Sequence, residues 1–117
     1  MSDLTELGVA AIRDGVAKGE FTAVEVANAF NTAVAEAQSA LNAFITLTPE
    51  KALEAAAAVD ADRAGGKTLG KMAGVPIGMK DLFATTGTKT TAASNILGNF
   101  VPPYESTVSQ KLWDAGG

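Results

Sequence analysis

The decapeptide Gly74–Phe83 places a lysine where a surface charge is not expected. Lys80 follows the apolar run Val75–Met79, and Asp81 and two large apolar residues come directly after it. A lysine at the end of a buried strand would lose water, which lowers the pKa of the amine and makes it a usable base near neutral pH. On the residues alone, an ordinary strand-end lysine whose apolar stem is covered and whose charge stays in water, next to Asp81, remains open as the alternative.

Two residue types that often act as nucleophiles, bases or metal ligands are absent from the chain. The 117-residue chain contains no Cys and no His. These absences exclude thiol nucleophiles, Ser-His arrangements and Cys- or His-ligated metal sites, so we predict no metal site in this chain. Acid–base chemistry here must use Lys, Tyr, Asp or Glu.

The charge and hydropathy pattern argues against a nucleic-acid-binding protein and against a membrane or secreted protein. The chain carries 9 basic and 13 acidic residues, a net charge of −4, without a basic cluster, which argues against direct nucleic-acid binding. We find no membrane-spanning apolar run, and the first ten residues lack the basic start of a signal peptide. We therefore predict a soluble cytoplasmic protein.

Helix signals dominate the first 40 residues. Asp3 followed by Glu6 predicts a capped helix that ends at Lys18-Gly19, and Thr22 followed by Glu25 fits a second capping box. Because only about three residues join the two helices, we expect residues 1–40 to form an antiparallel helical hairpin.

From residue 41 onward the pattern predicts both strands and helices. The β-branched and aromatic run 43–47 and the apolar run 75–79 are typical of short strands. Thr48-Pro49 predicts the start of a helix that ends at Gly65-Gly66, and residues 106–114 predict a last helix. Between them, residues 84–98 are rich in Thr, Ser, Asn and Gly, which favours loops around short strands.

Taken together, these residues resemble a known family. The decapeptide 74–83, the stretch TTGTKTTAAS at 85–94 and the continuation 94–108 are similar to the N-terminal part of the amidase signature family. Segments 22–26 and 41–45 fall in the family's order, so the resemblance spans roughly residues 5–117. It implies an α/β fold, a mixed sheet flanked by helices. Residues 1–117 would be the N-terminal portion of one incomplete domain, with the helical hairpin in 1–40 and the first strands and helices of the core in 41–117.

The resemblance also implies a mechanism. Family members hydrolyse amides with a Ser–cis-Ser–Lys triad, and Lys80 matches the proton-carrying lysine of the G-[IV]-P-[IV]-x-[IV]-K-D pattern. Met79 departs mildly from the usual Ile or Val. The Gly/Ser-rich stretch that carries both serines is absent from these 117 residues, so we expect this piece alone to be inactive. Ser94 is the one serine expected near the site, although a loop-capping hydroxyl is the alternative role for it.

Within the family, residues 94–108 resemble the branch of glutaminase subunits of tRNA-dependent amidotransferases. There, ammonia freed from glutamine passes to a partner subunit that uses ATP and Mg²⁺ to amidate mischarged tRNA. The resemblance thus implies sister subunits B and C, an indirect link to tRNA, and no cofactor in this chain. We expect the 117 residues alone to form a homo-oligomer. Two alternatives remain: another small-amide hydrolase of the family, and a non-enzymatic Ala-rich helical assembly module.

Overall fold

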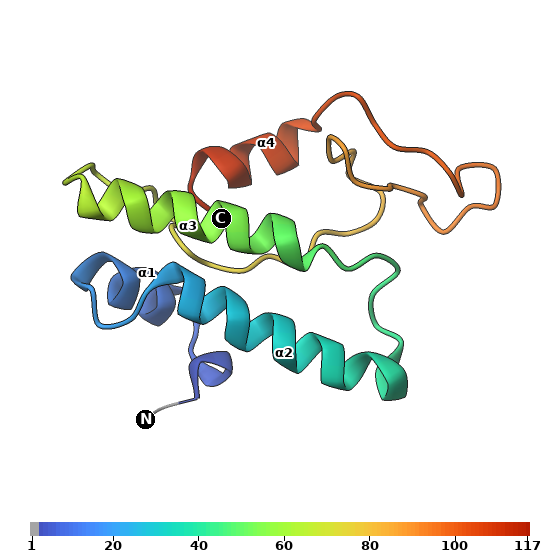
Figure 1. Ribbon diagram of the computed structural model, residues 1–117. Coiled ribbons are helices and arrows are strands. Elements are labelled where there is room, and N and C mark those ends of the chain that lie inside the picture. Colours follow the sequence, from blue (N-terminus) through green and yellow to red (C-terminus); the bar gives the residue numbers. More distant parts are fainter. Residues whose placement is uncertain (1–2) are drawn as a thin grey trace.

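The computed structural model describes residues 3–117, and within this range it is helical. Figure 1 shows a short 3-10 helix followed by four α-helices and long irregular segments. The elements are η1 (Leu4–Glu6), α1 (Val9–Lys18), α2 (Ala23–Leu41), α3 (Pro49–Ala64) and α4 (Thr107–Asp114). None of these helices is long and apolar enough to cross a membrane.

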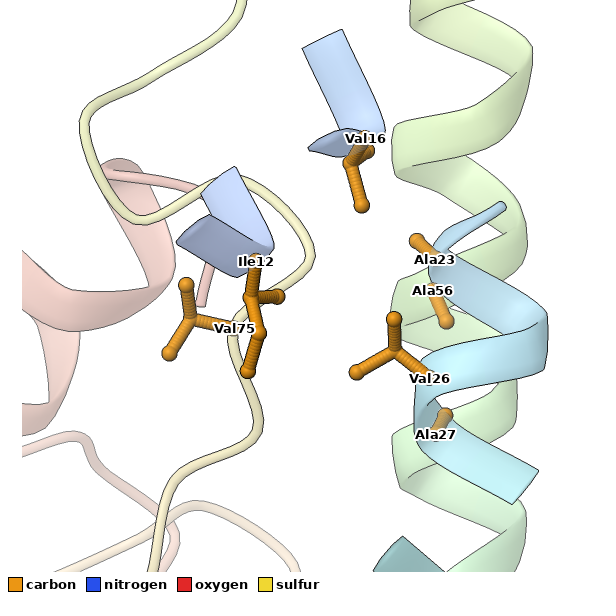
Figure 2. Packing of buried hydrophobic residues seen from close by; sticks show 7 residues of the cluster. All are labelled: Ile12, Val16, Ala23, Val26, Ala27, Ala56 and Val75. Carbon is orange, nitrogen blue, oxygen red and sulfur yellow. The ribbon is translucent and has the colours of Figure 1, made fainter. Parts of the chain in front are cut away.

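Small side chains hold the centre of the molecule together. The long helices α2 and α3 run side by side in opposite directions (Figure 1) and make the main helix–helix contact. Figure 2 shows the buried cluster, to which α1, α2, α3 and the segment after α3 all contribute. Its members are Ile12, Val16, Ala23, Val26, Ala27, Ala56 and Val75. Because alanines face one another across α2 and α3, the two backbones can approach closely.

The helices of residues 1–40 do not pack as the sequence predicted, which was as an antiparallel hairpin of two helices in contact with each other. Helix α2 packs on α3 and on η1 rather than principally on α1. Helix α1 still adds Ile12 and Val16 to the shared core. The Ala-rich face of α3 explains the difference, since it offers α2 a flatter surface than α1 does. The first two residues of the expected hairpin lie outside the described range.

Several predicted helix ends are confirmed. Thr22 and Glu25 form a reciprocal capping box, with Thr22 N–H donating to Glu25 Oε2 at 2.7 Å. Gly19 closes α1 in the left-handed conformation, with φ of 74°. Pro49 is the first residue of α3, and Ser106 caps α4 by accepting a hydrogen bond from Ser109 N–H.

The predicted capping box at Asp3 and Glu6 is wrong. Asp3 accepts from Thr5 N–H at 2.9 Å and thereby caps only the three-residue helix η1. Leu7 is extended, with φ of −76° and ψ of 141°, which interrupts the helical backbone. The longer helix therefore starts again at Val9, with Gly8 as its N-cap.

The predicted sheet is also not supported, because residues 3–117 contain no strand. At 43–47, the side-chain amide of Gln38 takes the place of a strand partner. It donates to Phe44 O at 2.6 Å and accepts from Phe44 N–H at 3.2 Å. The run 75–79 is irregular and forms no ladder, and Pro76 within it has no N–H to donate.

Segments 84–90 and 100–106 come closest to a paired ribbon. They run antiparallel, with backbone hydrogen bonds from Ser106 to Ala84, from Gly87 to Pro102 and from Thr90 to Phe100. The bonded positions are three residues apart in the first segment but four and two apart in the second, so the bonds are too sparse and uneven to make a regular ladder. They nevertheless fix the loop that carries Thr91 to Ser94.

Candidate functional site

Lys80 directly follows the irregular run 75–79, and its exposure differs from the expected burial. Val75 is buried at the start of the run, whereas Lys80 is exposed to solvent. Phe83 N–H donates to Lys80 O at 3.1 Å, which closes a turn directly after the lysine. Burial of Lys80 by a surrounding sheet is thus not seen within residues 3–117, because the sheet itself is absent.

A large hollow opens beside this turn. It measures about 1450 Å³ and is walled by parts of α2 and α3 and by much of the segment 68–93. Lys80 and Asp81 lie in its wall, as do Lys51 and Lys89. Apolar side chains such as Phe44 make up much of the remaining wall. The hollow therefore combines an apolar surface with a few charged groups, as substrate sites commonly do.

Asp81 is the most heavily hydrogen-bonded residue of this wall. Its carboxylate accepts from Thr91 N–H at 3.0 Å, from the Thr91 hydroxyl, and from Ala93 N–H at 3.5 Å. Its carbonyl oxygen accepts from Ala92 N–H at 2.8 Å. One residue thus binds three consecutive residues of the following loop.

These bonds also set the charge of Asp81. The hydroxyl of Thr91 lowers the pKa of the Asp81 carboxyl below its ordinary value of 3.8, against the opposing effect of burial. The N–H groups of Thr91 and Ala93 lower the pKa further, because all of these donors favour the ionised form. Asp81 is therefore a carboxylate at neutral pH.

Two further side chains fasten the loop that follows Lys80. Lys51, on α3, donates to Thr86 O at 3.2 Å and to Thr88 Oγ1 at 2.6 Å. Glu105 accepts from Thr86 N–H at 3.1 Å and from the indole N–H of Trp113 at 2.9 Å. The segment around 86–88 is thereby held from α3 on one side and from the start of α4 on the other.

Burial raises the pKa of Glu105, but hydrogen bonds outweigh that effect. Donors on Ser109, Trp113 and Thr86 together bring the pKa of Glu105 below its ordinary value of 4.5. Glu105 therefore binds its partners as an anion, which makes the hydrogen bonds charge-assisted.

The structure does not bring Ser94 to the hollow with Lys80. Ser94 N–H donates to Thr91 O at 2.8 Å, and Ser94 Oγ accepts from Ile96 N–H at 3.2 Å. Ser94 is also not part of the wall of the hollow. Its hydroxyl caps a loop, which is the alternative role that the sequence left open.

Sequence reasoning named Asp81 only as a neighbour of Lys80 and did not find Thr91 or Lys51. Their roles depend on contacts between residues 10 to 37 positions apart. The adjacent Lys-Asp pair was the one local signal available. Within residues 3–117, no group of three or more Asp and Glu side chains is arranged to hold a metal ion.

Comparison with known proteins defines the class to which this chain belongs. Residues 25–117 match the model of the family described as Amidase. The chain belongs to the amidase family, which confirms the resemblance noted in the sequence.

Two relatives that are similar along nearly the whole chain share one name. The chain is 76% identical over 116 residues to the A subunit of glutamyl-tRNA(Gln) amidotransferase from Novosphingobium aromaticivorans, and the match covers 99% of the chain and 24% of that protein. It is 67% identical to the protein of the same name from Sphingopyxis alaskensis, with 99% and 23% covered. The chain thus spans about a quarter of the length of these relatives.

A solved structure shares the backbone arrangement. It is described as "An unexpected vestigial protein complex reveals the evolutionary origins of an s-triazine catabolic enzyme", and its chain superposes with a TM-score of 0.90 at 31% identity. The match covers 94% of this chain and 24% of that chain. The arrangement of α1 to α4 and the intervening loops therefore also occurs inside a much longer chain.

Proposed function

We propose that residues 1–117 are the lysine-bearing N-terminal part of a glutamine amidohydrolase that supplies ammonia for tRNA-dependent transamidation. The observation that carries this proposal is the 76% identity over 116 residues to a protein named as the A subunit of glutamyl-tRNA(Gln) amidotransferase. The proposal includes sister subunits B and C as partners. One of these partners would use ATP and Mg²⁺, and tRNA would bind outside this chain. Such a role is cytoplasmic.

In this proposal Lys80 is the proton carrier. Lys80 would take the proton of a second serine through a bridging serine as that second serine attacks the amide carbon. The proton would then pass to the leaving nitrogen, so that ammonia departs, and water would hydrolyse the resulting acyl-serine. Both serines belong to polypeptide other than these 117 residues. The exposure of Lys80 is compatible with this role, because its side chain is free to reach groups contributed by additional polypeptide. The 117 residues alone would then be inactive.

A chimera tests the assignment. The aligned 116 residues of the Novosphingobium aromaticivorans protein are replaced by this chain, and ammonia release from glutamine is measured in the assembled amidotransferase. We expect activity close to that of the parent. A folded, assembled chimera without glutaminase activity would contradict the assignment.

The Lys80→Ala variant of the chimera tests the mechanism. Loss of a proton carrier should lower kcat by about 100-fold or more. Lys71→Ala is the matched control, since Lys71 is also an exposed lysine but lies outside the hollow and outside the Gly74–Phe83 motif. Equal activity of the Lys80→Ala variant and the control would remove Lys80 from the mechanism.

A second candidate is hydrolysis of another small amide. The 31% identity and TM-score of 0.90 to a structure concerned with an s-triazine catabolic enzyme favour this candidate over a non-enzymatic module. A protein that carries this chain with its own continuation, rather than the chimera, separates the two functions, because glutamine should be hydrolysed far faster than unrelated small amides under the first proposal alone.

We also propose that the 117 residues on their own self-associate. Leu41 and Ile45 are 70% and 63% exposed, and Phe44 and Leu47 beside them line the hollow. Apolar surface of this extent is rarely left uncovered in a stable monomer.

A further inference from the structure

The loop 91–93 contains two alanines in a backbone conformation that alanine avoids. Ala92 has φ of 49° and Ala93 has φ of 55°. The left-handed region is unfavourable for a residue with a β-carbon, and glycine is the residue that usually occupies it. Two consecutive strained residues persist only where their surroundings impose the conformation, and such strain is concentrated at functional sites.

Asp81 imposes this conformation. Four hydrogen bonds run from residues 91–93 to the carboxylate and the carbonyl oxygen of Asp81. The N–H groups of Ala92 and Ala93 therefore point at the same residue from successive positions. Thr91 is 6% exposed, so water does not compete freely for its hydroxyl.

The same bonds fix the backbone of Lys80. Asp81 is joined to Lys80 by one peptide bond, and the turn closed by Phe83 N–H holds the carbonyl oxygen of Lys80. Ala92 and Ala93 lie in the wall of the hollow together with Lys80. A displacement of Asp81 would therefore move the Lys80 backbone, and with it the Lys80 side chain. It would also move the part of the wall that Ala92 and Ala93 form.

We propose that Asp81 is a positioning residue for Lys80, acting through its hydrogen bonds to Thr91 and Ala93. This inference rests on the proposed function, in which Lys80 carries the proton. Asp81 does not itself exchange a proton with substrate. Asp81 sets the position of the Lys80 backbone, from which the side chain and its amine extend. It also keeps the loop 91–93 from collapsing into the hollow.

The test uses the glutaminase chimera with the variants Asp81→Asn and Thr91→Val. Asp81→Asn keeps the size of the side chain but places an amide N–H₂ where one of the two oxygens accepts. Misplacing a catalytic group by about 1 Å can cost on the order of 100-fold in rate. We expect each variant to lower kcat about 10- to 100-fold and to change KM much less than kcat, because the main effect is on the position of the Lys80 amine.

Three comparisons make the test decisive. Thr91→Ser keeps the hydroxyl and should restore most of the kcat lost in Thr91→Val. The double variant should lose no more than the worse single variant, because both changes break one interaction. Asp14→Asn, a matched change on α1 outside the hollow, should leave kcat unchanged.

Failure of the inference is distinguishable from failure of the proposed function. If Lys80→Ala abolishes activity while Asp81→Asn lowers only the melting temperature and leaves kcat intact, Asp81 is merely structural and the inference is overturned. If Lys80→Ala itself leaves activity intact, the proposed function is overturned, and the inference with it.

Discussion

The carboxylate of Asp60, on α3, accepts hydrogen bonds from the N–H of Ala23 at 2.8 Å and, through its second oxygen, from the N–H of Val24 at 3.0 Å. Ala23 is the first residue of α2, so a side chain 37 positions away completes the cap that Thr22 begins. The N-terminus of α2 is thereby bonded to the helix on which it packs, and the negative charge of Asp60 faces the positive end of the α2 dipole.

Asp60→Asn should destabilise the chain by about 1 kcal/mol, the typical cost of losing one helix cap. The asparagine retains one acceptor oxygen but loses the other and the charge. Urea unfolding followed by circular dichroism measures the change. Asp62→Asn is the control, because Asp62 pairs only with the exposed Lys67 at 2.9 Å; equal effects of the two variants would contradict a tertiary cap.

Gly70→Ala should destabilise the chain by about 1–3 kcal/mol, the range for forced overpacking. A β-carbon at Gly70 would lie 2.2 Å from the carbonyl oxygen of Ala115, and backbone atoms cannot swing aside as a side chain can. The same carbonyl oxygen accepts from Met72 N–H at 2.9 Å, so this bond should weaken too. Thermal unfolding measures the loss.

Gly78→Ala is the matched control for Gly70→Ala. A β-carbon there would meet only Phe44 Cε1, at the ordinary contact distance of 3.8 Å. We expect its melting temperature to match that of the parent chain or exceed it, because alanine restricts the unfolded chain. A Gly70→Ala variant as stable as Gly78→Ala would show that residues 70 and 115 are not in contact in solution.

The stability of the chain should fall in acid partly through Asp81. Because folding lowers the pKa of Asp81, its contribution is present above the ordinary value of 3.8 and is lost as the pH falls through the lower, folded-state pKa. Asp81→Asn removes this contribution at all pH values, so the free energy of unfolding should change less between about pH 5 and pH 2.

Thr91→Val refines the same measurement. Without the hydroxyl, the pKa of Asp81 in the folded chain should move back toward its ordinary value, so that stability is lost at a higher pH than in the parent. Thr91→Ser should behave as the parent does. Superimposable acid-unfolding curves for the parent, Thr91→Val and Asp81→Asn would contradict the hydrogen bonds assigned to Asp81.

Self-association of the 117 residues should depend on the hollow. Sedimentation at tens of micromolar (roughly the range where exposed apolar surface drives association) should show oligomers. Ile45→Asp puts a charge into the wall of the hollow and should shift the population toward monomer. Ile96→Asp is the control, since Ile96 is 94% exposed on a loop outside the hollow. A compact monomer in the parent chain would overturn the proposal.

Local signals predicted the helix ends well, and long-range contacts explain what they missed. Thr22 and Glu25, Gly19, Pro49 and Ser106 act within one turn of their own positions, so their spacing in the sequence is sufficient. A strand instead requires a neighbour, and neither predicted strand has one among residues 3–117. Propensity alone could not show that.

The residues of the candidate site also fall into two groups: those that a local sequence pattern indicated and those that only long-range contacts reveal. Lys80 and Asp81 stand out because a charged pair follows an apolar run. Thr91 acts through a bond across ten positions, and Lys51 through one across 37, and neither residue carries a local pattern. The strained backbone at Ala92 and Ala93 was equally hidden, because alanine is the residue least expected there.

The alanines that let α2 and α3 approach closely have a thermodynamic consequence. The buried core of the described residues consists of Ile12, three valines and four alanines, so little hydrocarbon is transferred to water when the chain unfolds. The heat capacity increment and the denaturant m-value both scale with newly hydrated surface. This chain should therefore unfold with a smaller heat capacity increment and a shallower urea dependence than its length suggests.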